Sequence, residues 1–378
     1  MELLYLAPIR LPTEKAHGIQ IMETCAAMSR AGAEIELVIP NRKTHIKEDP
    51  FNYYSIKERF PITRLRVPDT VSCGRFGFIF YAVIFAIRAA FYSRRIGADF
   101  IYTRDPITLC TLGVFRVRPL AWEIHTAHPR VPKFIMRGVS AFVPITRGLA
   151  RWYEARGVPT ADIHVAPDAV DLSLFNAVKD RQKERAALRA RLEIPAESKI
   201  ALYIGSFGLY AWKGVDVARK AAEHAPEIRW LFVGGTAKEC EELTRGAPKQ
   251  VMTLPRVRRE DIANLLCAAD VLLLPNKSGD PASERDTSPM KLFEYMASGV
   301  PVVASDVPSL REVLNKRNSF LAPPNDPKAL AEEVRGILSN PDEAEARASA
   351  ARIDVEAYTW DKRAEDMLNF LKQRTKTG

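Results

Sequence analysis

The sequence predicts an α/β protein with two domains in series, each a parallel β-sheet covered by helices. Three observations lead to this prediction. Short apolar runs alternate with helical patterns along the chain, which is the order that builds parallel strands with crossover helices. The alternation stops in the polar stretch 178–199 and then starts again. The chain has 378 residues, 47% hydrophobic and 27% charged, which is enough for two cores.

The first domain is expected over residues 1–170. It begins with a strand over ELLYLA, a helix over GIQIMETCAAMSRAG and a strand over EIELVIP. Buried parallel strands are short, nearly continuous apolar runs. Four later runs fit that description and are predicted strands: FIYTR, LAWEIH, AFVPIT and IHVAP.

The second domain is expected over residues 171–357, after a boundary near 168–176. Its predicted strands are IALYIGS, RWLFVGG, QVMTLP, VLLLPN and PVVAS, with helices such as REDIANLLCAA between them. A last helix over WDKRAEDMLNFLKQR, within residues 358–378, is expected to cross back onto the first domain. Because ligands bind beyond the carboxyl ends of parallel strands, two facing sheets would share an interdomain cleft.

The segment RDTSPMKLFEYMASGVPVVASD, residues 285–306, predicts a loop, a helix and a strand. Ser288 is a good N-cap, Pro289 suits the first helical position and Gly299 suits the C-terminal stop. A helix N-terminus favours an anion such as phosphate. Asp286 lies just ahead of this end and Glu294 lies on the second turn, so both are suited to accept hydrogen bonds from sugar hydroxyls. The alternative is that both acids only decorate the surface of a helix start.

Three further candidates follow predicted strands. Gly18 opens a helix after the first strand, where a glycine either admits a ligand close to the backbone or only serves the turn. His125 ends LAWEIH and is either a ligand-binding residue or a hydrogen-bonded structural one. Lys213 follows a strand and a glycine-bearing loop in YIGSFGLYAWKGVD. Its ammonium either neutralises a diphosphate or is solvated.

The composition argues against several classes of protein. The five cysteines are odd in number and show no C-x-x-C spacing, which argues against a disulfide framework or a structural zinc site. The sequence has no D-x-D pattern, Walker loop or G-x-G-x-x-G fingerprint, so neither a metal nor a dinucleotide cofactor is expected. MELLYLAPIR has no basic region ahead of its apolar run and predicts a strand rather than a signal peptide. We therefore expect a cytoplasmic protein.

The net charge is +9, and the first half of the chain carries most of it. Residues 57–95 contain eight Lys and Arg against two Asp and Glu, a difference of +6. They include FGFIFYAVIFAIRAAFY (76–92), whose apolar run before Arg88 has twelve residues, fewer than the roughly 20 that span a bilayer. We expect this segment either to be a core helix or to lie on a membrane surface with its arginines toward anionic head groups. No nucleic acid is expected as a partner, because no recognition motif accompanies the basic residues.

Together these patterns resemble glycosyltransferase family four, retaining enzymes of the GT-B fold that use nucleotide-sugar donors. The resemblance covers nearly the whole chain, and its most specific part is DTSPMKLFE. It implies two Rossmann-like domains facing an interdomain cleft, with the acceptor side in the N-terminal domain and the donor side in the C-terminal one. The other segments that carry it are the Gly18 loop, IYTRDP, EIH, VAPDAVDLSLF, YIGS followed by WKG, FVGG, YMASGVPVVASD and YTWDKRAE.

The resemblance also implies a role for each candidate residue. Asp286 and His125 would contact the donor sugar, Glu294 would hold the ribose hydroxyls and Lys213 would bind the diphosphate. Two positions depart from the family pattern, because Asp286 stands where a glutamate is usual and Ser206 where an arginine usually pairs with the lysine. The remaining donor-binding positions would be Gly18, Ser206 and the backbone of Thr287, Ser288, Pro289 and Met290.

The activity implied is transfer of a sugar with retention at the anomeric carbon. The leaving diphosphate would help to deprotonate the acceptor hydroxyl, so no protein nucleophile is needed. The expected partners are a UDP- or GDP-linked sugar and a carbohydrate or lipid-linked acceptor, in envelope polysaccharide or glycolipid synthesis at the inner face of the membrane. Two alternatives stay open: a sugar-nucleotide epimerase of the same fold, and an inactive relative that binds membranes or polyanions through residues 57–95.

Overall fold

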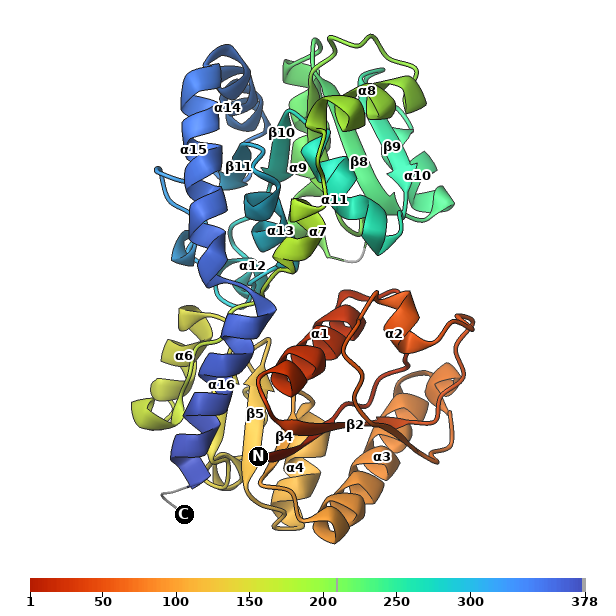
Figure 1. Cartoon of the computed structure of the whole chain (residues 1–378), viewed down its shortest axis with the longest axis vertical. Helices are drawn as coiled ribbons and strands as arrows, with labels where there is room; N and C mark the ends of the chain where they lie inside the picture. Colours follow the sequence, from red (N-terminus) through yellow and green to blue (C-terminus); the bar gives the residue numbers. More distant parts are fainter. Residues whose placement is uncertain (209, 376–378) are drawn as a thin grey trace. The chain divides into compact units, whose positions relative to one another are not determined.

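The structure, a computed structural model, describes residues 1–208 and 210–375 and divides into two compact units (Figure 1). Unit 1 comprises Met1–Pro167 and Trp360–Gly378, and unit 2 comprises Asp168–Thr359. The boundaries expected from the sequence, at residues 170 and 358, differ from these by three and two residues. Each unit is an α/β domain with its own sheet, as predicted.

Unit 1 is built on a parallel sheet in the order β3-β2-β1-β4-β5-β6. This is the Rossmann order, in which the two halves of the sheet meet between the first and fourth strands. The strands are β1 (Glu2–Leu6), β2 (Glu34–Pro40), β3 (Ile62–Leu65), β4 (Phe100–Thr103), β5 (Leu120–Ile124) and β6 (Ala141–Pro144). The helices are α1 (Ala16–Arg30), α2 (Pro50–Tyr53), α3 (Gly74–Ile96), α4 (Pro106–Val114), α5 (Lys133–Met136), α6 (Arg147–Glu154) and α16 (Trp360–Thr375), and α16 lies beside α1.

One predicted strand of unit 1 is absent, and one observed strand was not predicted. The segment IHVAP forms no strand, because the 3-10 turn Thr160–Asp162 and Pro167 bound it and only Ile163 bridges to Phe142. Strand β3, a half-exposed strand at the edge of the sheet, was not predicted. An edge strand faces solvent and so lacks the continuous apolar run of a central parallel strand.

Unit 2 repeats this architecture in the order β12-β11-β10-β7-β8-β9, again all parallel. Its core lies on both faces of the sheet. The strands are β7 (Ile200–Ile204), β8 (Arg229–Gly235), β9 (Val251–Pro255), β10 (Val271–Leu274), β11 (Val302–Ser305) and β12 (Phe320–Ala322). The helices are α7 (Leu172–Asn176), α8 (Arg181–Arg191), α9 (Val215–His224), α10 (Ala237–Thr244), α11 (Arg259–Cys267), α12 (Pro281–Glu284), α13 (Met290–Ser298), α14 (Pro327–Ser339) and α15 (Pro341–Asp354).

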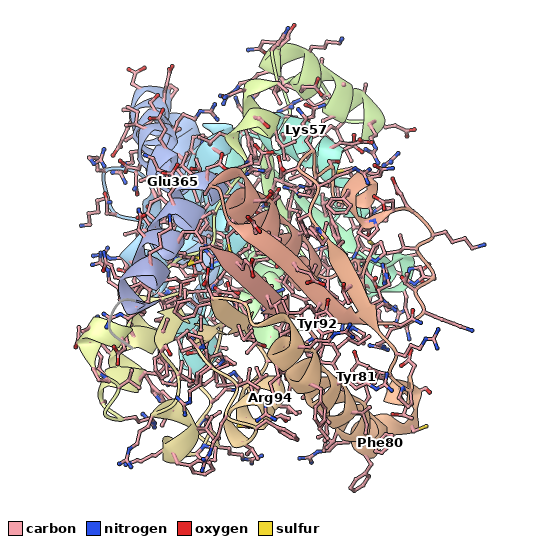
Figure 2. The ribbon with its side chains drawn as sticks, turned by 60° about the horizontal axis from the view of Figure 1, so that its bottom comes forward. Lys57, Phe80, Tyr81, Tyr92, Arg94 and Glu365 are labelled. Atoms are coloured by element: carbon pink, nitrogen blue, oxygen red, sulfur yellow. The ribbon has the colours of Figure 1, made fainter. Side chains whose placement is uncertain are left out.

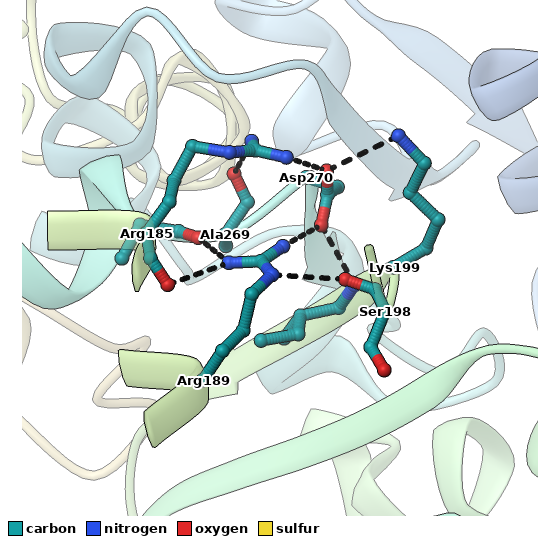
Figure 3. A network of polar contacts seen from close by, with 8 residues as sticks. Arg185, Arg189, Ser198, Lys199, Ala269 and Asp270 are labelled. Atoms are coloured by element: carbon teal, nitrogen blue, oxygen red, sulfur yellow. Dashed lines mark hydrogen bonds and ion pairs between the residues drawn. The ribbon is translucent and has the colours of Figure 1, made fainter. Parts of the chain in front are cut away.

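A buried ion cluster fastens α8 to the amino ends of β7 and β10 (Figure 3). Asp270 is 5% exposed and accepts from Nη2 of Arg189 at 2.7 Å and from the backbone N–H of Ile200 at 2.8 Å. Arg185 also donates to Asp270, and Nζ of Lys199 lies 3.8 Å from it. The cluster lies at the amino ends of the strands, whereas ligands of such folds bind at the carboxyl ends. We therefore assign it to the stability of unit 2.

Helix α3 of unit 1 buries one face and exposes an apolar opposite face. Tyr81, Phe85 and Ala89 belong to the core, whereas Phe76 is 86% exposed and Phe80 53% exposed. Figure 2 shows Phe80 on α3, pointing away from the body of the unit. By length and composition alone, Val71–Ile96 is one candidate membrane span among the described residues, and 44% of its most apolar window is buried. The prediction of a core helix is therefore correct for the buried face of α3 but does not explain its exposed apolar face.

Candidate active site

The predicted site residues fall into two sets, one in each unit. Asp286, Glu294, Lys213, Ser206 and 287–290 lie in unit 2, whereas Gly18 and His125 lie in unit 1. In both units they follow the carboxyl ends of strands, where ligands of parallel sheets bind. Among the described residues, no group of three His, Cys, Asp or Glu side chains could hold a metal ion.

A hydrogen bond joins the middle of α13 to the end of β7 in unit 2. The backbone N–H of Ile204, the last residue of β7, donates to the hydroxyl of Tyr295 on α13 at 2.9 Å. Tyr295 is fully buried. As a result, the loop with Ser206 and Lys213 and the segment with Asp286 and Glu294 belong to one side of the same domain. The structure thus brings together two segments that are about 80 residues apart in the sequence.

Helix α13 begins at Met290, one residue later than predicted, and Ser288 is not its N-cap. Pro289 is the N-cap, with an extended backbone at φ −79° and ψ 133°. The hydroxyl of Ser288 instead accepts from the backbone N–H of Asp168 at 3.2 Å, so it ties the helix start to the beginning of unit 2. The predicted C-terminal stop is correct, because Gly299 has the left-handed conformation at φ 62°.

The carboxylate of Asp286 is buried ahead of α13 and is held by its sequence neighbour. Asp286 is 6% exposed, and Nε of Arg285 donates to Oδ1 at 2.6 Å while Nη2 donates to Oδ2 at 3.2 Å. Thr287 and Ser288 are also buried, each 8% exposed. Because this carboxylate is buried and paired with an arginine, Asp286 is not an exposed surface residue at the helix start, which was the alternative interpretation.

Lys213 and Ser206 contact each other at the end of β7. Nζ of Lys213 donates to Oγ of Ser206 at 2.8 Å, and it lies 5.0 Å from the ring centroid of Tyr210. Burial lowers the pKa of the Lys213 ammonium. Lys213 is therefore not a solvated loop residue, which was the alternative interpretation of its position in the sequence.

Glu294 lies on α13, one turn after a lysine that sequence reasoning did not single out. Burial raises the pKa of the Glu294 carboxyl, partly offset by Arg259 and Lys291. Nζ of Lys291 lies 4.0 Å from the ring centroid of Tyr203 on β7. A Cβ atom placed on Gly205 would be 2.9 Å from the same Nζ. Lys291 therefore reaches back from the helix start to the end of β7.

His125 in unit 1 is a neutral, partly enclosed imidazole. Its Nε2 lies 3.3 Å from Oε1 of Glu123 and 3.4 Å from Nε2 of Gln20. Burial and, to a smaller extent, Arg104 lower its pKa to about 4, against the opposing effect of Glu123. The ring is uncharged at neutral pH and is 19% exposed, so it can still meet a ligand as a hydrogen-bonding group.

Glu123 is the centre of a buried polar network that sequence reasoning missed. It is fully buried, and Oε1 accepts from Nη2 of Arg363 at 2.6 Å while Oε2 accepts from the hydroxyl of Tyr5 at 2.6 Å. Burial would raise the pKa of Glu123, but Arg363, His125 and Arg104 outweigh that effect and hold it well below its usual range. The sequence does contain a signal for this network: Glu123 lies inside an otherwise apolar strand, and a buried glutamate needs a polar or charged partner.

Gly18 has a packing role in unit 1. A Cβ atom there would lie 2.2 Å from the hydroxyl of Tyr54, which donates to the carbonyl of Thr13 at 2.6 Å and accepts from the N–H of Thr13 at 2.8 Å. Any other residue at position 18 would displace the Tyr54 ring and the loop that it holds. A contact of Gly18 with a donor stays a prediction.

The two Rossmann-ordered domains and their strand-end residues define the class of protein as GT-B. Solved structures of that fold superpose on the whole chain. Sucrose-phosphate synthase from Thermosynechococcus elongatus has a TM-score of 0.77 at 20% identity and covers 100% of both chains. Anabaena HepE in complex with UDP and glucose has a TM-score of 0.75 at 18% identity, covering 99% of this chain and 100% of that one.

The sequence comparisons find similarity to one family of glycosyltransferases. Residues 198–340 match the family described as "Glycosyl transferases group 1". A D-inositol 3-phosphate glycosyltransferase of Xylanimonas cellulosilytica is 34% identical over 225 residues, which are 57% of this chain and 52% of that protein. The chain spans about half the length of the curated relatives it matches. The chain is thus similar to the group 1 glycosyltransferases over its second half, and the solved structures show that it has the GT-B fold.

Proposed function

We propose that the protein is a retaining glycosyltransferase that moves a sugar from a UDP- or GDP-linked donor to an acceptor hydroxyl. The observation that carries this proposal is the fastening of α13 to β7, which groups Lys213 and the buried carboxylate of Asp286 on one side of unit 2. A cation and a helix N-terminus suit a diphosphate, and carboxylates suit sugar hydroxyls. The similarity of residues 198–340 to the group 1 glycosyltransferases supports the same activity.

The proposed reaction breaks the bond between the anomeric carbon and the diphosphate oxygen and forms one from that carbon to the acceptor oxygen. The acceptor proton passes to the leaving diphosphate, on the same face of the sugar. Lys213 and the start of α13 would stabilise the charge that develops on the diphosphate. Asp286 and Glu294 would position the donor. A contact of His125 with the donor sugar stays a prediction.

Ligand-induced stabilisation tests the donor side. The full chain is heated with UDP, GDP or ADP, and a ligand at 100 times its dissociation constant should add about 2.7 kcal/mol to the free energy of unfolding. UDP is the first choice, because HepE has been solved with UDP and with UDP-glucose. No shift with any of the three would contradict the proposal. Product formed from the donor alone would favour the epimerase, and nucleotide binding without turnover would favour the inactive relative.

We also propose that the outer face of α3 binds an anionic membrane surface. Phe76, Phe80 and Phe91 are 86%, 53% and 58% exposed, and they lie on one face at helical spacing. The helix contains no acidic residue, and the exposed Arg88 and Arg95 lie beside this face. Aromatic side chains next to arginines suit the interface of a bilayer that contains anionic lipids.

This surface supports a lipid-linked or envelope acceptor and action at the inner face of the membrane. A Bacillus subtilis relative, 29% identical over 183 residues, is named for teichuronic acid biosynthesis, which supports an envelope acceptor.

All five cysteines are free thiols, which supports a reducing compartment. Lys57 does not belong to the surface around α3, since it lies apart from Arg94 and Phe80 in Figure 2. The proposed membrane surface is therefore the outer face of α3.

Vesicle flotation tests this surface. At low salt the wild type should float with vesicles that contain phosphatidylglycerol and stay behind with phosphatidylcholine alone. Arg88→Gln and Arg95→Gln should each weaken binding about fivefold, since an arginine near an anionic surface contributes about 1 kcal/mol. Phe76→Ser with Phe80→Ser should abolish flotation, and Lys57→Gln is the matched control that should not change it. Equal flotation with neutral vesicles, or equal effects of Lys57→Gln and Arg88→Gln, would contradict the proposal.

A further inference from the structure

At the end of β7, position 206 has an uncharged side chain, and the side chain of Lys291, from another segment, lies beside it. The serine at position 206 is uncharged, and its hydroxyl only accepts from Lys213 at 2.8 Å. Nζ of Lys291 lies above the Tyr203 ring, 4.0 Å from its centroid, next to Gly205. The ammonium of Lys291 therefore lies immediately before position 206, although it comes from the first turn of α13.

Gly205 leaves room for this ammonium. Its backbone has φ +149°, and a Cβ atom there would lie 2.9 Å from Nζ of Lys291 and 3.0 Å from the hydroxyl of Tyr203. A side chain at position 205 would thus push the lysine away from the end of the strand. The glycine, the tyrosine ring and the helix start together fix where the Lys291 ammonium lies.

The two lysines form a cationic pair that lacks a carboxylate partner. Among the residues that the structure describes, neither ammonium has a carboxylate oxygen within 4.0 Å. Burial lowers the pKa of Lys291, Lys213 lowers it further, and Glu294 raises it. Enclosed like charges with no carboxylate in direct contact cost stability, and such groups gather where an anion binds.

We propose that Lys291 acts with Lys213 as the second cation that binds the donor diphosphate, in place of a charged side chain at position 206. This inference rests on the proposed glycosyltransferase function. The two ammonium groups would bind the phosphate oxygens from either side of the β7 end, while the α13 N-terminus faces the same anion. Both would stabilise the leaving diphosphate as the bond to the sugar breaks.

Lys291→Met tests this inference, because methionine keeps the length of the side chain and removes the charge. Its affinity for UDP, measured by calorimetry, should fall about 10- to 150-fold, the loss expected for one charge-assisted hydrogen bond. Its affinity for uridine, which has no phosphate, should stay within twofold. Lys291→Arg should retain most of the UDP affinity, and Lys238→Met, in an 85% exposed lysine of unit 2, should retain all of it.

Stability without ligand separates a binding role from a structural one. If Lys291 only supports the fold, Lys291→Met should lower the midpoint of thermal unfolding and weaken UDP and uridine equally. If it binds the diphosphate, the midpoint without ligand should be unchanged or higher, because repulsion from Lys213 is relieved. Wild-type affinity for UDP and GDP in both Lys291→Met and Lys291→Arg would overturn the inference and leave the proposed function intact. No binding of either nucleotide by the wild type would overturn both.

Discussion

Nη2 of Arg363 on α16 lies 2.6 Å from Oε1 of Glu123 on β5, and the two side chains are 4% and 1% exposed. This pair joins residues 240 positions apart within unit 1. Nε of Arg363 also donates to the carbonyl of Pro167 at 2.8 Å, so the same side chain holds the chain where it leaves unit 1. The last helix thus supports the carboxylate that lies against His125.

Removing Arg363 should destabilise unit 1 strongly. Arg363→Met leaves Glu123 buried without its main counter-charge, and breaking a buried pair in this way costs about 3 to 5 kcal/mol. Urea unfolding of the full chain measures the loss. The double variant Arg363→Met, Glu123→Gln should recover part of it, because no buried charge then remains unpaired. Glu365→Gln, on the exposed face of the same helix, is the control. A loss no larger than that of Glu365→Gln would show that the pair adds nothing to stability.

The stability of the protein should depend on the protonation of His125 in acid. Its pKa is about 4 in the folded state against an ordinary value of 6.5, because burial and Arg104 disfavour the imidazolium. A histidine whose pKa is lowered by folding contributes stability above pH 6.5, and that contribution is lost as the pH falls from 6.5 toward 4. The shift corresponds to at most about 3 kcal/mol.

Unfolding measured at pH 7, 6, 5 and 4 checks this dependence. His125→Gln should reduce the slope of the free energy of unfolding against pH in that range, whereas His224→Gln, at an exposed position, should leave it unchanged. His17, whose pKa is also lowered to about 4 by burial and by Arg104, should account for part of the slope that remains. The same slope in His125→Gln as in the wild type would contradict the assignment.

Asp286 and Glu294 should be separable by kinetics. If Glu294 accepts hydrogen bonds from the ribose, Glu294→Gln should weaken UDP and the sugar donor alike, by about 10- to 150-fold. If Asp286 contacts only the transferred sugar, Asp286→Asn should depress transfer by a similar factor and leave the UDP affinity nearly unchanged. Calorimetry with UDP beside transfer rates makes the comparison. Equal losses of UDP affinity in both variants would rule out separate roles.

The Asp270 cluster should affect stability without affecting ligand binding. Arg189→Met removes one charged hydrogen-bond donor from the buried Asp270, which keeps Arg185 and the N–H of Ile200, so the free energy of unfolding should fall by about 1.5 to 3 kcal/mol. Because the cluster lies at the amino ends of β7 and β10 (Figure 3), the affinity of the folded protein for UDP should not change. A large loss of UDP affinity in a variant that is still folded would show that the cluster reaches the site.

Local patterns predicted the central strands of both sheets well, because a buried parallel strand is a continuous apolar run. Edge strands such as β3 and β12 (Phe320–Ala322) were not predicted, since they are short and β3 is half-exposed. Contacts between residues far apart in the sequence could not be predicted from local patterns either. Lys291 looks like an ordinary helix residue in the sequence, and only the fold brings its ammonium beside Gly205. Ser288 has the residue type of an N-cap, but its hydroxyl is used by Asp168 instead.

Acceptor-dependent release of nucleoside diphosphate is the most direct test of the proposed activity. The full chain is incubated with UDP- or GDP-linked sugars, with and without an extract of envelope lipids and polysaccharides, and the released UDP or GDP is measured. We predict release that depends on the extract and falls about 100- to 1,000-fold in Lys213→Met, because one charge that stabilises the leaving group is removed. No release with any donor, or equal release by the wild type and Lys213→Met, would contradict the account.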